Sequence, residues 1–269
     1  MIIRFVMAIV FGLWLSQSAT ADPTLELSGE FAPGSLIIGQ TDPGTKLTMD
    51  GNPVRVSESG RFLLGLGRDA SGQVELMING STSYQYDITA RDYDIQRIDG
   101  LPTNQVTPNP TTVARTKRER ALILDVRKVD SLETWFTGGF MWPVTGPISG
   151  VYGSQRILNG KPRSPHNGVD IAAPRGSEIV AMGDGKVVLV HEDMFYTGKT
   201  VMIDHGHGLT SVYIHMDTLL VGQDEMITKG TPIGTVGKTG RTTGPHLHWG
   251  VTLFSTHLDP MLVVGKMPD

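Results

Sequence analysis

Residues 244–253 read Gly244-Pro245-His246-Leu247-His248-Trp249-Gly250-Val251-Thr252-Leu253. The alternation over His246–Leu253 predicts a β-strand. Alternate side chains of a strand share a face, so His246 and His248 point the same way, whereas Leu247 points into the opposite layer. This stretch therefore predicts a β-protein that carries two imidazoles on one strand face.

Two further stretches bring residues of the same chemical kind. The first runs from Ser164 to Asp170 and contains His166, and the second reads Tyr213-Ile214-His215-Met216-Asp217. Histidine and carboxylate are the ligand types that hold a catalytic zinc ion while leaving a position open for water. The chain has no cysteine, which excludes a disulfide framework, a thiolate nucleophile and a cysteine-based zinc site.

The spacing of His166 and Asp170 has two interpretations. A spacing of four residues would place them together on a helix. However, Gly168 and the following Ile171-Ala172-Ala173-Pro174 favour a loop that enters a strand. A turn at Asn167-Gly168 could then fold His166 back toward Asp170.

Composition limits the remaining function classes. The 269 residues allow one large domain or two modest ones, and 33 glycines and 16 prolines fit many short strands joined by tight turns. The formal net charge is −4. Because this balance offers no polycation, we expect no nucleic-acid partner.

Residues 1–21 have the pattern of a secretory signal peptide. Arg4 precedes an apolar run from Phe5 to Leu15, and Ser18-Ala19-Thr20-Ala21 supplies an A-x-A cleavage pattern. A membrane anchor is the alternative, but the run is shorter than the ~20 apolar residues of a spanning helix. We therefore expect an exported, periplasmic protein with no membrane insertion after the signal is cleaved.

Residues 22–98 predict a small β-sandwich-like accessory domain. Asp50-Gly51 and Asn79-Gly80 are hairpin signals between short strand-like runs. The domain contains no histidine and offers no catalytic constellation, so we interpret it as a structural, docking or regulatory module. The expected strands cover residues 36–39, 46–49, 54–56, 61–64, 74–78 and 82–86.

Residues 99–135 predict a linker with one helix. Three prolines precede Thr111 and Thr112, either of which can cap a helix that continues to about Asp130. Leu122, Val126 and Val129 would form its apolar stripe. A further hypothesis is that this linker and the accessory domain restrict access to the catalytic cleft.

Residues 136–269 predict a compact antiparallel β-sheet with long loops. No helical pattern of 10–15 residues interrupts the strands, and this argues against a parallel α/β sheet. The fold class is therefore mainly β. The expected strands are Lys186–His191, Thr200–His205, Thr210–His215 and His246–Leu253.

The motifs His166-x-x-x-Asp170, Tyr213-x-His215 and Gly244-Pro245-His246-x-His248 closely resemble those of the lysostaphin/LytM-type zinc endopeptidases, which cut peptide cross-links in peptidoglycan. The resemblance covers roughly residues 138–265 and keeps the order of the motifs. It implies a LytM-like peptidase domain over residues 136–269 with Zn²⁺ as cofactor and a peptidoglycan peptide as substrate partner.

The resemblance also implies a role for each residue of the set. His166, Asp170 and His248 would be the zinc ligands, and His246 would be the general base. His215 would help to stabilise the oxyanion and to orient the water. The resemblance leaves open which of His215 and His246 is the principal base.

Some alternatives remain at this level. A non-enzymatic, cell-wall-binding regulator or activator of other wall hydrolases is the second function class, and the intact ligand set speaks against it. A pure wall-binding module is the third class, and it would need neither His215 nor His246. The target bond would be D-alanyl-meso-diaminopimelate, with a glycine bridge as the competing substrate. Arg156, Lys161, Arg163 and Arg241 could meet substrate carboxylates. We expect His205 to be structural and His207 to be exposed, and His191 and His257 to be structural or solvent-facing.

Overall fold

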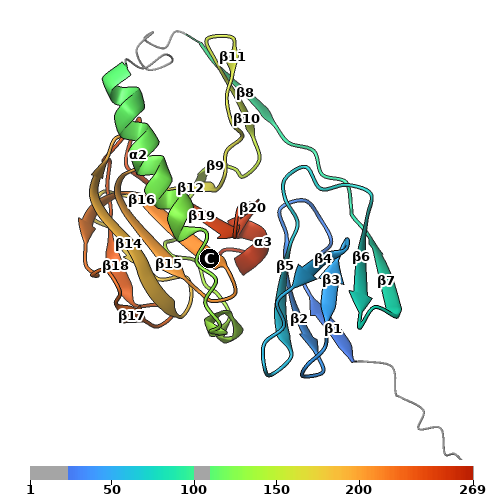
Figure 1. Ribbon diagram of the computed structural model, residues 1–269. Helices are drawn as coiled ribbons and strands as arrows, with labels where there is room; N and C mark the ends of the chain where they lie inside the picture. Colours follow the sequence, from blue (N-terminus) through green and yellow to red (C-terminus); the bar gives the residue numbers. More distant parts are fainter. Residues whose placement is uncertain (1–23, 100–109, 269) are drawn as a thin grey trace, which may run out of the picture.

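The computed structural model describes residues 24–99 and 110–268. The predicted signal peptide, residues 1–21, lies outside the described residues, as does part of the predicted linker. No helix within the described ranges is both long and apolar enough to cross a membrane. The fold is mainly β, which confirms the predicted class (Figure 1).

The N-terminal part folds into two small antiparallel sheets that enclose a core of their own. Ile37, Phe62, Leu64 and Leu76 are almost completely buried between them. One sheet has the order β1-β2-β5 and the other β4-β3-β6-β7. The strands are β1 Leu25–Ser28, β2 Leu36–Thr41, β3 Leu47–Met49, β4 Asn52–Val54, β5 Arg61–Gly65, β6 Gln73–Ile78 and β7 Thr82–Asp87.

Both expected hairpin turns are present in this part. Asp50 and Gly51 have φ of 49° and 76°, and they join β3 to β4. Asn79 and Gly80 have φ of 52° and 71°, and they join β6 to β7. Positive φ at both central residues matches the right-handed twist of the paired strands, which explains why these two dipeptides predict hairpins well.

Two elements connect this part to the rest of the molecule. β8 (Ile95–Ile98) pairs in parallel with β10 (Gln155–Leu158), and β10 pairs with β11 (Lys161–Pro162). The helix α2 (Pro110–Val126) lies against the large sheet beside β14, where Ile123 and Val126 pack on buried Met202, Val212 and Ile214.

The apolar stripe predicted for this helix is wrong at Leu122. Its side chain is 46% exposed, whereas the neighbouring Ile123 packs on the sheet. The helix also ends at Val126, four residues before the expected Asp130. Leu122 and Ile123 are both apolar, so the sequence pattern alone does not say which of them faces the sheet. Packing against the sheet selects Ile123.

The C-terminal part is built on one large antiparallel sheet in which β19 lies centrally, between β16 and β12. The path is β17-β14-β15-β16-β19-β12-β9, with β13, β18 and β20 attached to it. Its strands are β9 Ile148–Gly150, β12 Val169–Ala172, β13 Glu178–Val180, β14 Gly185–Met194, β15 Gly198–Asp204, β16 Leu209–Leu219, β17 Met226–Ile227, β18 Pro232–Val236, β19 His246–Leu253 and β20 Thr256–Leu258. The short helices η1 (Trp135–Gly138) and α3 (Pro260–Val264) flank it.

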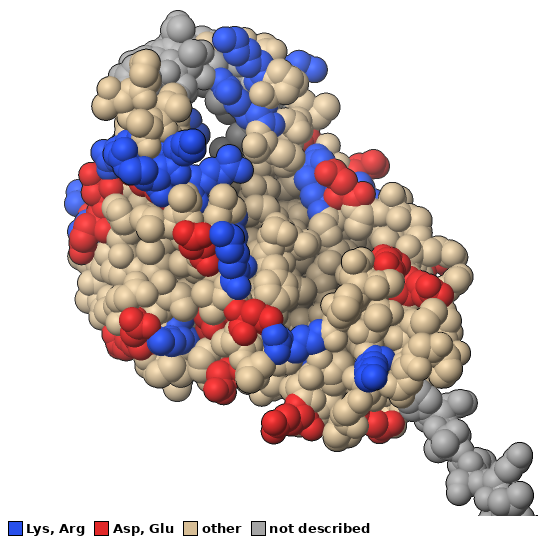
Figure 2. Space-filling model, in the orientation of Figure 1, with Lys and Arg blue, Asp and Glu red and all other residues tan. Residues whose placement is uncertain are grey.

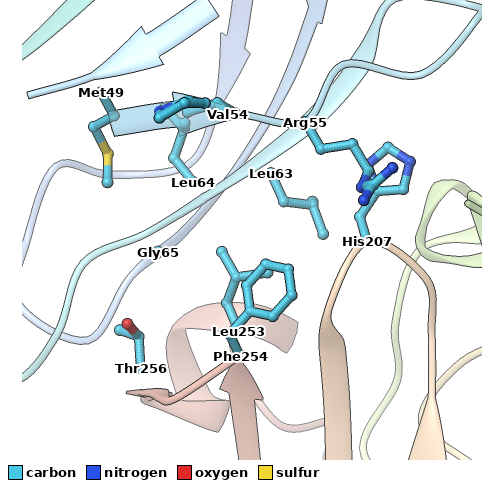
Figure 3. A pocket seen from close by; sticks show the side chains of 11 residues that line it. Met49, Val54, Arg55, Leu63, Leu64, Gly65, His207, Leu253, Phe254 and Thr256 are labelled. Carbon is cyan, nitrogen blue, oxygen red and sulfur yellow. The ribbon is translucent and has the colours of Figure 1, made fainter. Parts of the chain in front are cut away.

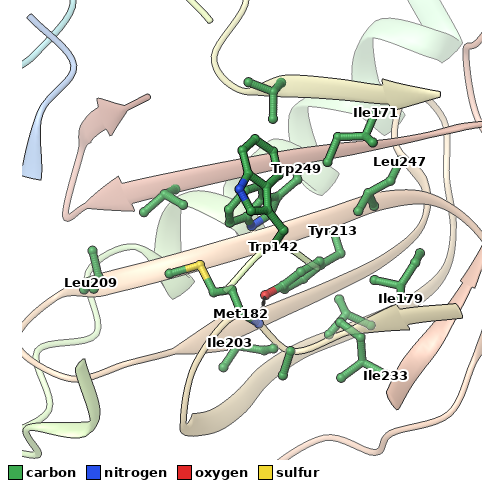
Figure 4. Close-up of a cluster of buried hydrophobic side chains, with 14 of the residues drawn as sticks. Trp142, Ile171, Ile179, Met182, Ile203, Leu209, Tyr213, Ile233, Leu247 and Trp249 are labelled. Carbon is green, nitrogen blue, oxygen red and sulfur yellow. Dashed lines mark hydrogen bonds between the residues drawn. The ribbon is translucent and has the colours of Figure 1, made fainter. Parts of the chain in front are cut away.

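One face of β19 anchors the core of this sheet. Leu247, Trp249 and Val251 are completely buried, and Trp249 packs on Trp142 with ring centroids 5.6 Å apart (Figure 4). Tyr213, from the neighbouring β16, is also completely buried, and its hydroxyl accepts a hydrogen bond from the backbone N–H of Met182 at 2.9 Å. Because this face is fixed in the core, the alternate residues of β19 are held on the opposite face.

The two parts of the molecule meet through polar and apolar contacts. Arg91 reaches Asp259 at 2.6 Å, where the carboxylate is 1% exposed and also caps α3. A cavity of about 200 Å³ lies at this junction (Figure 3). Leu63 and Leu64 from the N-terminal part, and Leu253, Phe254 and His207 from the large sheet, are among the residues that line it.

Candidate metal centre

Strand pairing brings the candidate ligands of the two distant motifs side by side. In the pairing of β12 with β19, Asp170 lies opposite His248. His248 also lies opposite Ile214 of β16, so His215, the next residue of β16, lies close to His248. The central place of β19 between β12 and β16 therefore explains why the three motifs occur together.

Three donor atoms converge at this place. Asp170 Oδ1 lies 2.7 Å from His248 Nδ1 and 3.1 Å from His166 Nε2, and the two nitrogens are 2.9 Å apart. Burial alone would raise the pKa of Asp170, but the hydrogen bonds from His166 and His248 outweigh it and hold the pKa well below its usual range. Among the described residues, these three form the group that could hold a metal ion.

The arrangement fits a zinc ion by the chemistry of its donors. Ligands about 2.0–2.2 Å from a tetrahedral ion stand about 3.3–3.6 Å apart, so the three atoms, now 2.7–3.1 Å apart, need to separate only slightly to hold one. The carbonyl oxygen of Val151 lies 3.0 Å from His166 Nδ1 and accepts its N–H, so Nε2, which lies against Asp170 Oδ1, would bind a metal ion once it gives up its proton. Such a hydrogen bond on the far side of the ring is the usual support of a metal-binding histidine.

Two glycines allow the backbone to approach this group. A Cβ at Gly150 would lie 2.3 Å from Asp170 Oδ2. A Cβ at Gly168 would lie 2.3 Å from the carbonyl oxygen of Trp249 and 2.9 Å from His248 Nε2. The segment from His166 to Asp170 is thus a loop entering a strand, as predicted, and Gly168 is required where that loop passes β19.

His246 and His215 flank the three donors. His246 Nε2 is 3.8 Å from Asp170 Oδ1, and its Nδ1 lies 3.0 Å from both the Gly244 carbonyl oxygen and Thr242 Oγ1. The rings of His246 and His215 have centroids 4.9 Å apart. The structure therefore brings together all five residues of the predicted set.

His215 is held in an unusual backbone conformation. Its φ is 63°, and its Nδ1 donates to the carbonyl oxygen of Thr239 at 2.8 Å. Burial lowers the pKa of His215 to about 4. A neutral ring that donates through Nδ1 presents an unprotonated Nε2, so His215 accepts hydrogen bonds from this position.

The second H-x-H motif lies apart from the metal centre. His205 is completely buried, and its two ring nitrogens lie 2.7 Å from the Asp184 carbonyl oxygen and 2.8 Å from Ser211 Oγ, which fits the structural role expected. The expectation that His207 is exposed is wrong, because its exposed fraction is 3%. Residues before the large sheet cover it. The backbone N–H of His207 donates to the carbonyl oxygen of Ser131 at 3.0 Å, and the His207 ring packs on Phe136.

Sequence reasoning missed the groups that orient the histidine rings. The acceptors at Val151, Gly244 and Thr239 are backbone carbonyls, which leave no mark in the sequence. Thr242 could have been found in the sequence, because it is a hydroxyl residue only four positions before the candidate base His246. Its Oγ1 donates to the Gly244 carbonyl oxygen at 2.9 Å.

Basic side chains surround a hollow on the surface. Figure 2 shows Lys and Arg gathered around it, between α2 and the sheet formed by β8, β10 and β11. Of the candidates for substrate contact, Lys161 and Arg163 are exposed, and Arg241 lies over the Tyr196 ring at 4.2 Å. The side chain of Arg156 lies outside the described residues.

Comparisons with known proteins agree with this geometry. Residues 164–260 match the model of peptidase family M23. The chain is 35% identical over 133 residues to the peptidoglycan DD-endopeptidase ShyB of Vibrio cholerae, which is 49% of this chain and 28% of that protein. It is 42% identical over 86 residues to ShyA, a peptidoglycan DD-endopeptidase of the same organism, which is 32% of this chain and 20% of that protein.

A solved structure extends the likeness beyond residues 164–260. A crystal structure of a Pseudomonas aeruginosa protein classed with peptidase family M23 superposes with a TM-score of 0.66 and 27% identity, covering 88% of this chain and 96% of that one. Residues 164–260 therefore match peptidase family M23, which confirms the resemblance seen in the motifs. The chain spans less than a third of the length of the two Vibrio relatives.

Proposed function

We propose that this protein is an exported, zinc-dependent endopeptidase that hydrolyses the peptide cross-links of peptidoglycan. The single observation that carries the proposal is the convergence of two imidazole nitrogens and one carboxylate oxygen, with two further imidazoles beside them. The two similar Vibrio proteins are peptidoglycan DD-endopeptidases, which supports peptidoglycan as the substrate. We assign the bond between D-alanine and meso-diaminopimelate as the target, and a periplasmic location follows from the predicted signal peptide.

His166, Asp170 and His248 would hold the zinc ion. When bound there, zinc polarises a peptide carbonyl and lowers the pKa of water. Of the three residues, Asp170 brings the negative charge, and the Val151 carbonyl fixes the ring of His166. The three side chains come from or directly precede two central strands, so their positions are set before any ion arrives.

His246 is the proposed general base. Its Nδ1–H donates to the Gly244 carbonyl oxygen, so Nε2 carries the lone pair and faces Asp170 Oδ1 at 3.8 Å. From this position it can accept a proton from the attacking water and pass the proton to the departing amine. Thr242 Oγ1, 3.0 Å from His246 Nδ1, steadies the ring.

His215 is the proposed partner of this base. As a neutral ring it accepts a hydrogen bond through Nε2, which suits the orientation of the attacking water. Stabilisation of an oxyanion requires that His215 has first gained a proton, because only a protonated Nε2 can donate. The Thr239 carbonyl oxygen holds the ring in place in either state.

The decisive experiment is digestion of purified Gram-negative peptidoglycan by residues 22–269, with the released fragments identified by mass spectrometry. We expect cross-linked dimers to disappear, new D-alanine carboxyl termini to appear, and the zinc content to be one ion per chain. A chelator should stop the reaction, and added zinc should restore it. Intact dimers in the presence of stoichiometric zinc would overturn the activity and favour the regulator.

A second digestion tests the assigned bond. A glycine-bridged wall serves as the comparison substrate under the same conditions. Faster cleavage of the glycine bridges than of the D-alanyl-meso-diaminopimelate bonds would reject the assigned specificity while leaving the peptidase activity intact.

A further inference from the structure

Arg127 is a partly buried cation without an acidic partner among the described residues. It follows the last residue of α2, and among residues 24–99 and 110–268 no carboxylate pairs with it. Its Nε has no hydrogen-bond partner in the same described ranges. Burial, together with the nearby charge of Arg120, lowers the pKa of Arg127 to about 10, so it remains charged at neutral pH. Buried arginines are ordinarily paired.

His257 is the one polar side chain in contact with this guanidinium in the part of the chain that the structure describes. Its Nε2 lies 3.5 Å from Arg127 Nη1. Because arginine can only donate, Nε2 accepts, and the proton of the neutral ring lies on Nδ1. His257 Nδ1 is likewise buried without a described partner. The pair therefore offers two unsatisfied N–H donors and one positive charge (Figure 1 shows the end of α2 beside β20).

The pair lies on the same face of the sheet as the metal centre. His257 of β20 pairs with Thr252 of β19, and Thr252 shares its strand face with His248 and His246. A second connection runs through the loop after β9. Tyr152 donates its hydroxyl to the His257 carbonyl oxygen at 2.8 Å, while the adjacent Val151 accepts from His166.

We propose that Arg127 and His257 form a subsite for a free carboxylate of the peptide substrate. The proposal rests on the proposed function, since it assigns a contact of the substrate that the metal centre would cleave. Arg127 supplies the charge and its N–H donors, and His257 Nε2 contacts one edge of the guanidinium. A carboxylate accepts from the guanidinium and neutralises it, which a neutral peptide cannot do. Arg127, directly after α2, lies outside the matched range 164–260, whereas His257 lies within it.

The test uses the zinc-loaded chain 22–269 with a purified muropeptide dimer and with the same dimer after its carboxylates are converted to amides. We expect Arg127→Gln to raise KM for the native dimer roughly ten- to hundredfold and to leave kcat within about twofold. The amidated dimer should show the same increase in KM with the unmodified enzyme, and no further increase with the variant. Arg127→Lys should recover part of the loss.

Arg118→Gln is the matched control. It removes the same charge from an exposed position nine residues away on α2, on the opposite side of the helix. An unchanged KM in Arg127→Gln, or a control variant that loses as much, would overturn the subsite. So would an amide effect that adds to that of Arg127→Gln, because independent effects mean that the guanidinium does not meet the carboxylate.

A binding measurement separates this inference from the proposed function. Calorimetric titration of the monomeric disaccharide tetrapeptide compares the unmodified chain with Arg127→Gln, and circular dichroism establishes that both are folded. If the dimer is never cleaved but the monomer binds at least tenfold more weakly to the variant, the activity fails and the subsite stands. Equal binding by the two folded proteins overturns the subsite whatever the activity.

Discussion

Asp170 brings the negative charge to the candidate metal centre, and its neighbours keep that charge in place. His166 and His248 hold the pKa of this carboxyl low, and Gly150 provides the space beside it. At this scale the sequence predicted much: the five residues of the motifs are the five that the structure brings together. It could not predict the backbone carbonyls that orient the rings, because every residue type carries the same carbonyl.

Asp170→Ala should lose bound zinc and activity together. The change removes one of three ligands and the charge that two imidazoles cannot replace. We expect at least a tenfold loss of zinc affinity, measured by competition with a chromogenic chelator, and no detectable dimer cleavage. Full activity in this variant would contradict the ligand assignment.

His246→Ala should separate metal binding from turnover. The ring lies beside the donors without being one of the three, so zinc content should stay at the level of the unmodified protein. Loss of a general base lowers kcat by roughly 10²–10⁴-fold. Metal analysis and initial rates on the same preparation check both parts. If zinc disappears with the activity, His246 is a ligand, and His215→Ala becomes the variant that reports on the base.

At the scale of elements, prediction worked where the signal is local. Asp50-Gly51 and Asn79-Gly80 predicted their turns because glycine, and asparagine or aspartate before it, are the residues that adopt positive φ most readily. His207 was mispredicted because its burial is not local: residues of the connector, about 70 positions earlier, cover the turn. The rotation of α2 was likewise set by the sheet that it covers.

The burial of His205, in the turn after β15, predicts that the free energy of unfolding depends on pH. Burial lowers the pKa of His205 from 6.5 to about 4. As pH falls from 6.5 toward about 4, the unfolded chain binds a proton that native His205 refuses, so the free energy of unfolding falls. The loss from this residue is at most roughly 3 kcal/mol.

Urea unfolding in the presence of a chelator, between about pH 7.5 and about pH 4.5, measures this slope. His205→Gln keeps a polar side chain but removes the titration, and it should flatten the slope relative to the unmodified protein. The metal ligands titrate equally in both proteins, so they cancel. Parallel slopes would show that His205 is protonated as readily in the native state as in the unfolded chain.

The whole molecule depends on contacts that no local pattern announces. Arg91 and Asp259 are 168 residues apart in the chain, yet they form an ion pair that joins the two parts. Neither residue stands in a motif. Their pairing follows only from the way the N-terminal sheets dock beside α3, which explains why the sequence predicted the two parts but not their junction.

Arg91→Met should destabilise the protein more than Arg55→Met. Asp259 is 1% exposed and would lose its charged partner, which costs about 2 kcal/mol once the 29% exposure of Arg91 is considered. Arg55 and Asp130 are 35% and 36% exposed, so that pair contributes less than about 1 kcal/mol. Urea unfolding of the three proteins measures the difference. Equal losses would mean that burial of Asp259 does not set the strength of the junction.

The parallel pairing of β8 with β10 limits how this protein can be divided. A cut after residue 98, the predicted end of the accessory domain, leaves the third strand of a sheet on one fragment and the other two on the second. The fragment with β10 would then present a row of unpaired N–H and C=O groups, which is a template for pairing with another chain. Chimeras and truncations of this protein should therefore be joined before Ile95, so that the strand stays with the hairpin it completes.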